Sequence, residues 1–266
     1  MTRRIPVRKP AHLPADIDAD VKLPEQGARY ARDVLRLPVG EVVELFDGEG
    51  TCVLARLTEI TQERVIATIE EVLPDRAGES SLELILYQAI PKGDRFEWLL
   101  EKCTELGVTQ ICPIETARTV VKIKPSKSAA KLERWQKITA SAARQSRRAL
   151  VPTVHEARSF EQALRDASAR LEVGDAASID LVASPSPDES TPSPGLAESL
   201  MRAQRLSTVA IWIGPEGGFT QSEVKALQGA GATTVSMGPR ILRAETAAVA
   251  ALTLGPVAML GAIAMH

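Results

Sequence analysis

Short apolar runs separated by polar turns predict a group of β-strands in the first part of the chain. An apolar run over residues 42–46 leads into 47–50, whose Asp-Gly sequence is typical of a turn. Further apolar runs over 52–55 and 65–69 follow at short spacing, with no helical pattern between them. Closely spaced strands of this kind favour a small β-barrel-like domain.

From residue 82 onward, strand patterns alternate with helical ones. An apolar strand is predicted over 82–87, and a helix begins at Asp94, with Glu97 placed to complete a capping box, and ends at Gly107. Further strands are predicted over 111–114, 119–123, 181–183, 209–213 and 233–237, and further helices over 129–148 and 247–252. This alternation predicts an α/β domain with a mostly parallel sheet.

The polar, turn-rich stretch 74–80 separates the two patterns. It predicts two domains, residues 1–74 and residues 75–266. A second stretch, 185–194, holds four prolines with serines and acidic residues and is expected to form an exposed loop.

Two predicted strands run directly into glycine-containing segments. The strand over 209–213 is followed by Gly-Pro-Glu-Gly-Gly-Phe at 214–219, and Thr220 and Glu223 form a capping box for the next helix. The strand over 233–237 is followed by Gly-Pro-Arg-Ile-Leu-Arg at 238–243. Glycines at the carboxyl ends of parallel strands let the backbone approach a ligand, so the two junctions predict one composite pocket. The alternative is a pair of tight turns that bind nothing.

Several familiar sites are absent from the sequence. It contains no G-x-x-x-x-G-K-[ST] phosphate-binding loop, no G-x-G-x-x-G after a strand and no G-x-S-x-G nucleophile elbow. Its three cysteines have no zinc-site spacing and do not form a disulfide framework, and its three histidines are far apart. We therefore expect no metal site.

Charge is unevenly distributed along the 266 residues, although the formal net charge is only −2. Between Arg118 and Arg148 there are ten Lys or Arg residues and one acidic residue, Glu133. One acidic residue is too few to pair with ten basic ones along a helix. The charge pattern therefore favours RNA binding over a solvated helix face stabilised by internal ion pairs. The candidate phosphate contacts are Lys131, Arg134, Lys137, Arg144, Arg147 and Arg148.

The composition is that of an ordinary globular protein, with 44% hydrophobic and 25% charged residues. No uncharged apolar run is long enough to span a membrane, and the basic N-terminus lacks the apolar stretch of a signal peptide. We therefore expect no membrane association and a cytoplasmic location.

The two glycine-containing junctions together resemble a known family. GPEGGFTQSEV followed by MGPRILRAETA resembles the signature of the RsmE branch of the SPOUT methyltransferases. Upstream, KGDRFEWLLEKCTELGV and RWQKITASAARQSRRALVP resemble the opening segment and the basic helix of that catalytic domain. ARDVLRLPVGEVVELFDGEG resembles the family's small PUA-like RNA-binding domain, although Arg29-Tyr30 stands where the family often has a histidine pair.

The resemblance implies a trefoil-knotted α/β methyltransferase domain behind a PUA-like β-barrel domain. It implies S-adenosylmethionine as methyl donor and, as substrate, N3 of a uridine in 16S ribosomal RNA, position 1498 in the bacterial numbering of that RNA, in the assembled small subunit. It also implies a homodimer with the C-terminal helix at the interface. The residues expected around the donor are Gly214, Pro215, Gly217, Gly218, Met237, Gly238, Ile241 and Leu242. A SPOUT enzyme acting on another ribosomal or transfer RNA site, or a non-catalytic RNA-binding protein, remain alternatives.

The chemistry that the resemblance implies needs a cation beside the uracil. Negative charge spreads onto the carbonyl oxygens as N3 loses its proton, and a guanidinium would stabilise it. Arg243, at the end of the second junction, is the expected catalytic residue. Glu216 and Glu245 are both candidates for a general base. The alternative for Arg243 is an ion pair with Glu245 that only stabilises the start of the helix.

Overall fold

The chain forms two compact units, Met1–Glu79 with Ala140–Val151, and Ser80–Thr139 with Pro152–His266. The computed structural model describes residues 2–7, 13–14, 16–74, 79–173, 178–184, 193–203 and 206–263. The units differ from the expected division into 1–74 and 75–266 because residues 140–151 belong to the first unit. Residues 75–78 of the expected boundary and residues 185–192 of the expected exposed loop lie outside the described residues.

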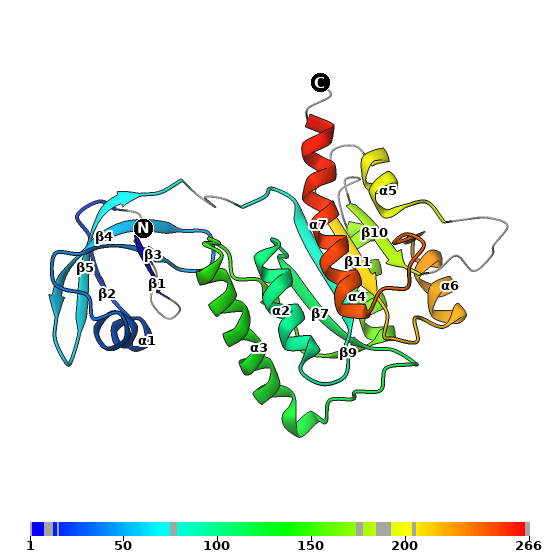
Figure 1. Ribbon diagram of the computed structural model, residues 1–266, viewed down its shortest axis with the longest axis horizontal. Helices are drawn as coiled ribbons and strands as arrows, with labels where there is room; N and C mark the ends of the chain where they lie inside the picture. Colours follow the sequence, from blue (N-terminus) through cyan, green and yellow to red (C-terminus); the bar gives the residue numbers. More distant parts are fainter. Residues whose placement is uncertain are drawn as a thin grey trace. The chain divides into compact units, whose positions relative to one another are not determined.

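The first unit is built on a five-stranded sheet with the order β1-β3-β4-β5-β2 (Figure 1). Its elements are β1 (Arg3–Pro6), β2 (Asp20–Lys22), the helix α1 (Glu25–Arg29), the π-helical turn η1 (Tyr30–Val34), β3 (Val42–Phe46), β4 (Cys52–Ile60) and β5 (Val65–Val72). β3, β4 and β5 confirm the three predicted strands and pair antiparallel, and their alternate side chains form the core of the unit. The closed barrel implied by the sequence stays a prediction.

A buried ion pair fastens residues 140–151 to the rest of the first unit. Arg148 donates to Glu79 at 2.9 Å, and the two side chains are only 6% and 5% exposed. Glu79 also accepts a hydrogen bond of 3.0 Å from the backbone nitrogen of Leu150. Burial of the Arg148 guanidinium against a carboxylate argues against its predicted role as a phosphate contact.

The second unit contains a seven-stranded sheet with the order β12-β10-β11-β6-β7-β8, and β9 also pairs with β7. All of these pairings are parallel, as predicted. The strands are β6 (Glu83–Ala89), β7 (Gln110–Glu115), β8 (Thr153–Val154), β9 (Arg158–Ser159), β10 (Ser178–Ala183), β11 (Thr208–Ile213) and β12 (Thr233–Val235). The helices are α2 (Arg95–Glu105), α3 (Pro125–Gln145), which continues into the first unit, α4 (Phe160–Val173), α5 (Leu196–Arg202), α6 (Gln221–Gly229) and α7 (Ala244–Ile263).

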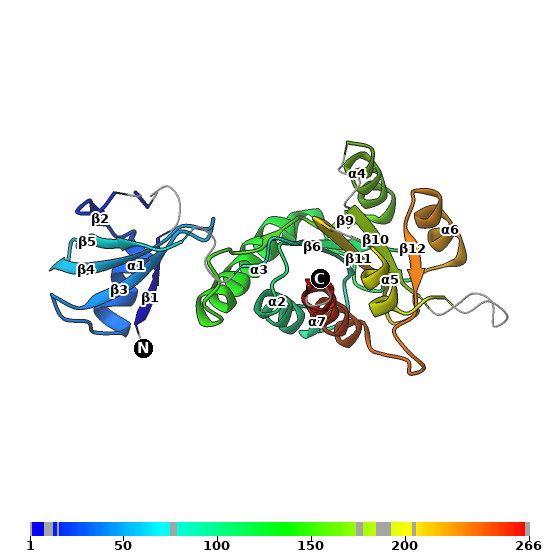
Figure 2. The ribbon, with the colours of Figure 1, turned by 90° about the horizontal axis from the view of Figure 1, so that it is seen from above.

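Helices cover both faces of this sheet, as a parallel sheet requires. Figure 2 shows α2 and α7 on one side and α4 and α6 on the other. Leu84, Leu86 and Ile211 face the first pair, whereas Tyr87 and Trp212 face the second. Tyr87 and Trp212 are stacked with their ring centroids 3.9 Å apart. Because the strands are parallel, the loops that follow them start at the carboxyl edge of the sheet.

Two local predictions in this unit are wrong. Residues 119–123 form no strand. The Thr119 hydroxyl accepts a hydrogen bond from the Thr116 backbone nitrogen and also bonds the Thr116 hydroxyl, and Glu115 accepts a hydrogen bond from the Ile123 backbone nitrogen. Such side-chain bonds compete with strand pairing. The helix α2 does follow Asp94, but the Asp94 side chain makes no capping hydrogen bond. Glu97 instead accepts a hydrogen bond from Arg134 at 2.7 Å.

In the described part of the chain, no helix is long and apolar enough to cross a membrane. The trefoil knot implied by the resemblance stays a prediction.

The buried pair of Arg148 and Glu79 gives a stability prediction. Glu79→Ala leaves the Arg148 guanidinium buried without its carboxylate, so we expect the free energy of unfolding to fall by about 3–5 kcal/mol. Urea denaturation followed by circular dichroism measures this. The control is Glu59→Ala, which removes the half-buried partner of the exposed Arg64 and is expected to cost no more than about 1 kcal/mol. Equal losses in the two variants would contradict the structural role of Arg148.

Candidate active site

The carboxyl ends of three neighbouring strands lie level at one edge of the parallel sheet. β10 pairs with β11 on one side and with β12 on the other, so Ala183 is in register with both Ile213 and Val235. The two glycine-containing junctions start immediately after Ile213 and soon after Val235. The register therefore brings the starts of both junctions to the same edge of the sheet, and the composite pocket itself stays a prediction. Ligands of open α/β sheets bind at such an edge.

The first junction is a tight turn that needs glycine. The Gly218 nitrogen donates to the Pro215 oxygen at 2.7 Å, and Gly218 has φ of +67°, a conformation that favours glycine. A Cβ on Gly214 would lie 3.0 Å from the Phe219 nitrogen, closer than real Cβ atoms ordinarily come. A Cβ on Gly218 would meet nothing within 4 Å, so this side of the turn is open to a ligand.

The second junction combines an open glycine with apolar side chains. Gly238 has φ of +99°, and a Cβ placed on it would meet nothing within 4 Å. Met237 and Leu242 are half-buried and pack against the core beneath α7. Ile241 is 99% exposed. Ile241 is therefore accessible to a ligand, although a single exposed apolar side chain does not by itself mark a binding site.

A third segment, missed by the sequence analysis, braces the first junction. Arg118, in the loop after β7, donates to the Gly217 oxygen at 2.6 Å. Nearby, the Ala117 backbone donates to Glu223 at 2.8 Å, and Glu223 also accepts from the Thr220 backbone at 2.7 Å. The predicted capping box of Thr220 and Glu223 is therefore confirmed. The buried Glu223 carboxylate also fastens the loop after β7 to the start of α6 through its bond to the Ala117 backbone. No signal in the sequence links segments about a hundred residues apart.

Arg243 and Glu245, both among the described residues, do not form the ion pair that was the alternative to a catalytic role for Arg243. Glu245 forms an ion pair of 3.7 Å with Arg95, the first residue of α2, rather than with Arg243. Arg95 also lies 3.6 Å from Glu216. Arg243 is exposed and makes no side-chain hydrogen bond or ion pair with any described residue. Its guanidinium is therefore available to a ligand.

The basic candidates for RNA contact have partners, some from elsewhere in the chain and some from their own helix. Arg147 pairs with Glu44 at 2.8 Å, and the Arg144 guanidinium lies over the Tyr30 ring at 4.4 Å. In the second unit, Arg134 pairs with Glu97, Lys137 pairs with Glu133, and Lys131 lies 6.0 Å from the centre of the Trp135 ring. The sequence analysis counted one acidic residue between Arg118 and Arg148 and so missed the ion pairs made with carboxylates outside that stretch. Apart from the buried Arg148, these side chains remain exposed or half-exposed.

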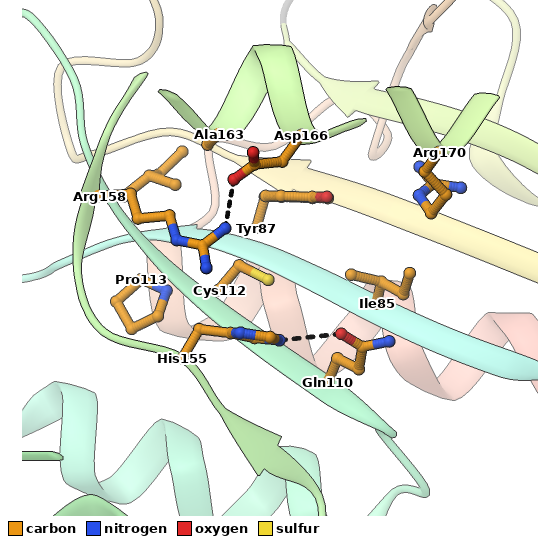
Figure 3. A pocket seen from close by; sticks show the side chains of 11 residues that line it. Ile85, Tyr87, Gln110, Cys112, Pro113, His155, Arg158, Ala163, Asp166 and Arg170 are labelled. Atoms are coloured by element: carbon orange, nitrogen blue, oxygen red, sulfur yellow. Dashed lines mark hydrogen bonds and ion pairs between the residues drawn. The ribbon is translucent and has the colours of Figure 1, made fainter. Parts of the chain in front are cut away.

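A pocket of about 190 Å³ lies elsewhere, on the side of the sheet covered by α4 (Figure 3). Burial raises the pKa of Tyr87 and of Cys112 to about 12, so both groups stay protonated near neutral pH. Burial lowers the pKa of His155, which bonds Gln110 at 2.9 Å. The pocket is lined by none of the residues predicted to bind a ligand.

The described residues contain no group of three or more His, Cys, Asp or Glu side chains able to hold a metal ion. All three cysteines are free and buried.

Comparisons with known proteins agree with this arrangement. A family described as an RNA methyltransferase domain matches residues 78–255, and one described as an RNA methyltransferase PUA domain matches residues 23–70. Ribosomal RNA small subunit methyltransferase E of Bacillus subtilis is 33% identical over 83% of this chain and 83% of its own length. The Synechocystis protein of that name is 34% identical over 89% of this chain and 72% of its own length.

A solved structure extends the likeness to three dimensions. The ribosomal RNA small subunit methyltransferase E of Neisseria gonorrhoeae, bound to S-adenosyl methionine, is 33% identical and superposes with a TM-score of 0.74. The alignment covers 94% of this chain and 95% of that one. The PUA-like unit and the SPOUT-type parallel-sheet unit are thus both accounted for. With its paired glycine junctions on a parallel sheet, the chain belongs to the ribosomal RNA small subunit methyltransferase E family.

Proposed function

We propose that this protein transfers a methyl group from S-adenosylmethionine to N3 of a uridine in 16S ribosomal RNA, position 1498 in the bacterial numbering. The observation that carries the proposal is the level arrangement of the β10, β11 and β12 ends, with the two open glycine junctions beside them. The names and the bound donor of the relatives support it. The substrate would be the assembled small subunit, met in the cytoplasm by a homodimer that associates through α7.

The residues at the strand edge fit the methyl donor. Gly218 and Gly238 both present backbone with open space above it, so a ligand can lie against each main chain. Gly214, Pro215 and Gly217 complete the first wall. Met237, Ile241 and Leu242 provide an apolar surface that suits an adenine ring. Bound S-adenosylmethionine supplies a methyl carbon attached to a positively charged sulfur.

The chain itself must position the uracil and stabilise its charge. N3 carries a proton near neutral pH and becomes a good nucleophile only as that proton passes to a base, for which Glu216 and Glu245 are the candidates. Arg243 is exposed beside the second junction and has no partner among the described residues, so its guanidinium is available to stabilise the negative charge on the neighbouring carbonyl oxygens. Holding N3 in line with the methyl carbon contributes further to the rate.

Primer extension on 16S ribosomal RNA tests the proposal, because a methyl group on N3 blocks Watson–Crick pairing and stops the polymerase. RNA from cells that lack the protein should lose the stop at the proposed uridine. Small subunits from those cells should regain the stop after incubation with the purified protein and S-adenosylmethionine. A methyl group at another ribosomal or transfer RNA position would contradict the proposed substrate, and failure to bind the donor would indicate a non-catalytic RNA-binding protein.

Donor binding is expected to depend on the backbone conformation of Gly218. Gly218→Val places a β-branched residue at φ of +67° and should strain or rearrange the turn, weakening donor affinity at least about tenfold in calorimetry. Gly231→Val is the matched control, since Gly231 also has positive φ and open space but follows α6. Similar donor affinities in the two variants would remove the first junction from the site.

The chemical step is expected to depend on Arg243. Arg243→Ala should reduce the single-turnover methylation rate by roughly a hundredfold or more, the scale seen when one preorganised charge-stabilising group is lost. The thermal unfolding midpoint should hardly change, because the side chain is exposed and has no described partner. Arg240→Ala removes a neighbouring exposed charge and is the control. A normal rate in folded Arg243→Ala protein would rule out the catalytic role.

RNA binding is expected to depend on basic side chains of the first unit that remain accessible. Replacing Arg144 and Arg147 with Ala together should weaken RNA binding and reduce the slope of log K against log salt by about 1.4–1.8. Binding isotherms at several salt concentrations measure the slope. The charge-matched control replaces Arg56 and Arg64, which pair with carboxylates on the sheet. An unchanged slope in the Arg144 and Arg147 variant would show that this face is only solvated.

A further inference from the structure

Arg95 connects the two glycine-containing junctions electrostatically. Its Nη1 lies 3.6 Å from Oε1 of Glu216 in the first junction, and its Nε lies 3.7 Å from Oε1 of Glu245 just after the second. Both distances exceed those of ordinary N–H···O hydrogen bonds, so the contacts are ion pairs rather than tight bonds. One cation at the start of α2 thus attracts carboxylates from both walls of the proposed donor site.

The two carboxylates have very different surroundings. The Glu216 side chain is 39% exposed and can be solvated by water. The Glu245 side chain is only 9% exposed, and its Oε2 is buried with no hydrogen-bond partner among the described residues. A buried polar atom without a partner is costly and uncommon, and calls for an explanation such as a functional role or a bound group.

The position of Glu245 connects this free oxygen to the proposed site. Glu245 lies in the first turn of α7, three residues after Leu242, which is a proposed donor contact. Arg243 does not neutralise it, and Arg95 reaches only its other oxygen. What Oε2 lacks is a hydrogen-bond donor, preferably a charged one, since charge-assisted bonds are the stronger kind.

We propose that Oε2 of Glu245 accepts a hydrogen bond from the ammonium group of bound S-adenosylmethionine and that Arg95 is a positioning residue for this carboxylate. The inference rests on the proposed function, because it takes the same donor at the same edge. It assigns Glu245 to donor recognition rather than to removal of the N3 proton.

Two ligands that differ in the amino-acid part separate this role from a structural one. S-adenosylmethionine carries the ammonium group, whereas 5′-deoxy-5′-methylthioadenosine has the same nucleoside but lacks both the amino-acid part and the positive charge on sulfur. Glu245→Gln keeps the size of the side chain but removes its charge. In calorimetry it should weaken S-adenosylmethionine binding at least about tenfold and change methylthioadenosine binding less than about twofold. S-adenosylhomocysteine, which keeps the ammonium group beside a neutral sulfur, should lose affinity as S-adenosylmethionine does if the ammonium group is the one recognised.

Two further variants complete the experiment. Arg95→Met should show the same selective loss of S-adenosylmethionine affinity, but a smaller one. The Arg95 side chain is 44% exposed, whereas Glu245 is only 9% exposed, so circular dichroism must first establish that this variant is folded. Lys102→Met is the control on the same helix and should change neither affinity, because the partners of Lys102 among the described residues are Glu101 and Glu105, away from both junctions.

The opposing outcomes are distinct. Equal losses for both ligands, or no loss for either, in Glu245→Gln and Arg95→Met would overturn the inference while leaving the proposed function intact. Unchanged S-adenosylmethionine affinity with a single-turnover rate lowered about a hundredfold would also overturn it and would assign Glu245 to the N3 proton instead. Failure of the unaltered protein to bind S-adenosylmethionine would overturn the proposed function together with this inference.

Discussion

The parallel pairing of β10 with both β11 and β12 is the constraint on which the proposed site depends. Backbone hydrogen bonds on both sides hold Ala183 level with Ile213 and Val235, so the segments that follow β11 and β12 emerge at the same edge. A slip of one residue in either pairing would turn every side chain of that strand to the opposite face. Burial of both faces beneath helices makes such a slip costly, and the register therefore fixes the position of both junctions.

The loops at this edge are held in place by groups from distant parts of the chain. Arg118 and the Ala117 backbone bind the first junction and the helix after it from the loop that follows β7. Arg95 attracts a carboxylate from each junction. Glycine supplies the permissive backbone, but these contacts restrict which conformation it adopts, and a restricted loop loses less entropy when a ligand binds. Preorganisation of this kind is the structural role of Arg95 and Arg118, which lie outside the glycine-containing segments.

Local signals explain what the sequence predicted well. The apolar run over 209–213, the glycines after it and the Thr220–Glu223 capping box act within a few residues, and all appear as expected. The basic helix was also found, but the partners of its charged residues were not. Glu44 and Glu79 lie about 103 and 69 residues from Arg147 and Arg148, and no periodicity links them. The strand expected over 119–123 failed because side-chain bonds from Thr119 and Glu115 competed with pairing.

Hydrogen exchange measured by mass spectrometry, with and without S-adenosylmethionine, tests most directly whether the donor binds at this strand edge. The account predicts slower exchange of backbone amides in residues 214–219 and 236–243 when the donor is added, with little change in β7 and α4. Protection confined to β7 and α4, which line the pocket around Cys112 and His155, would contradict it.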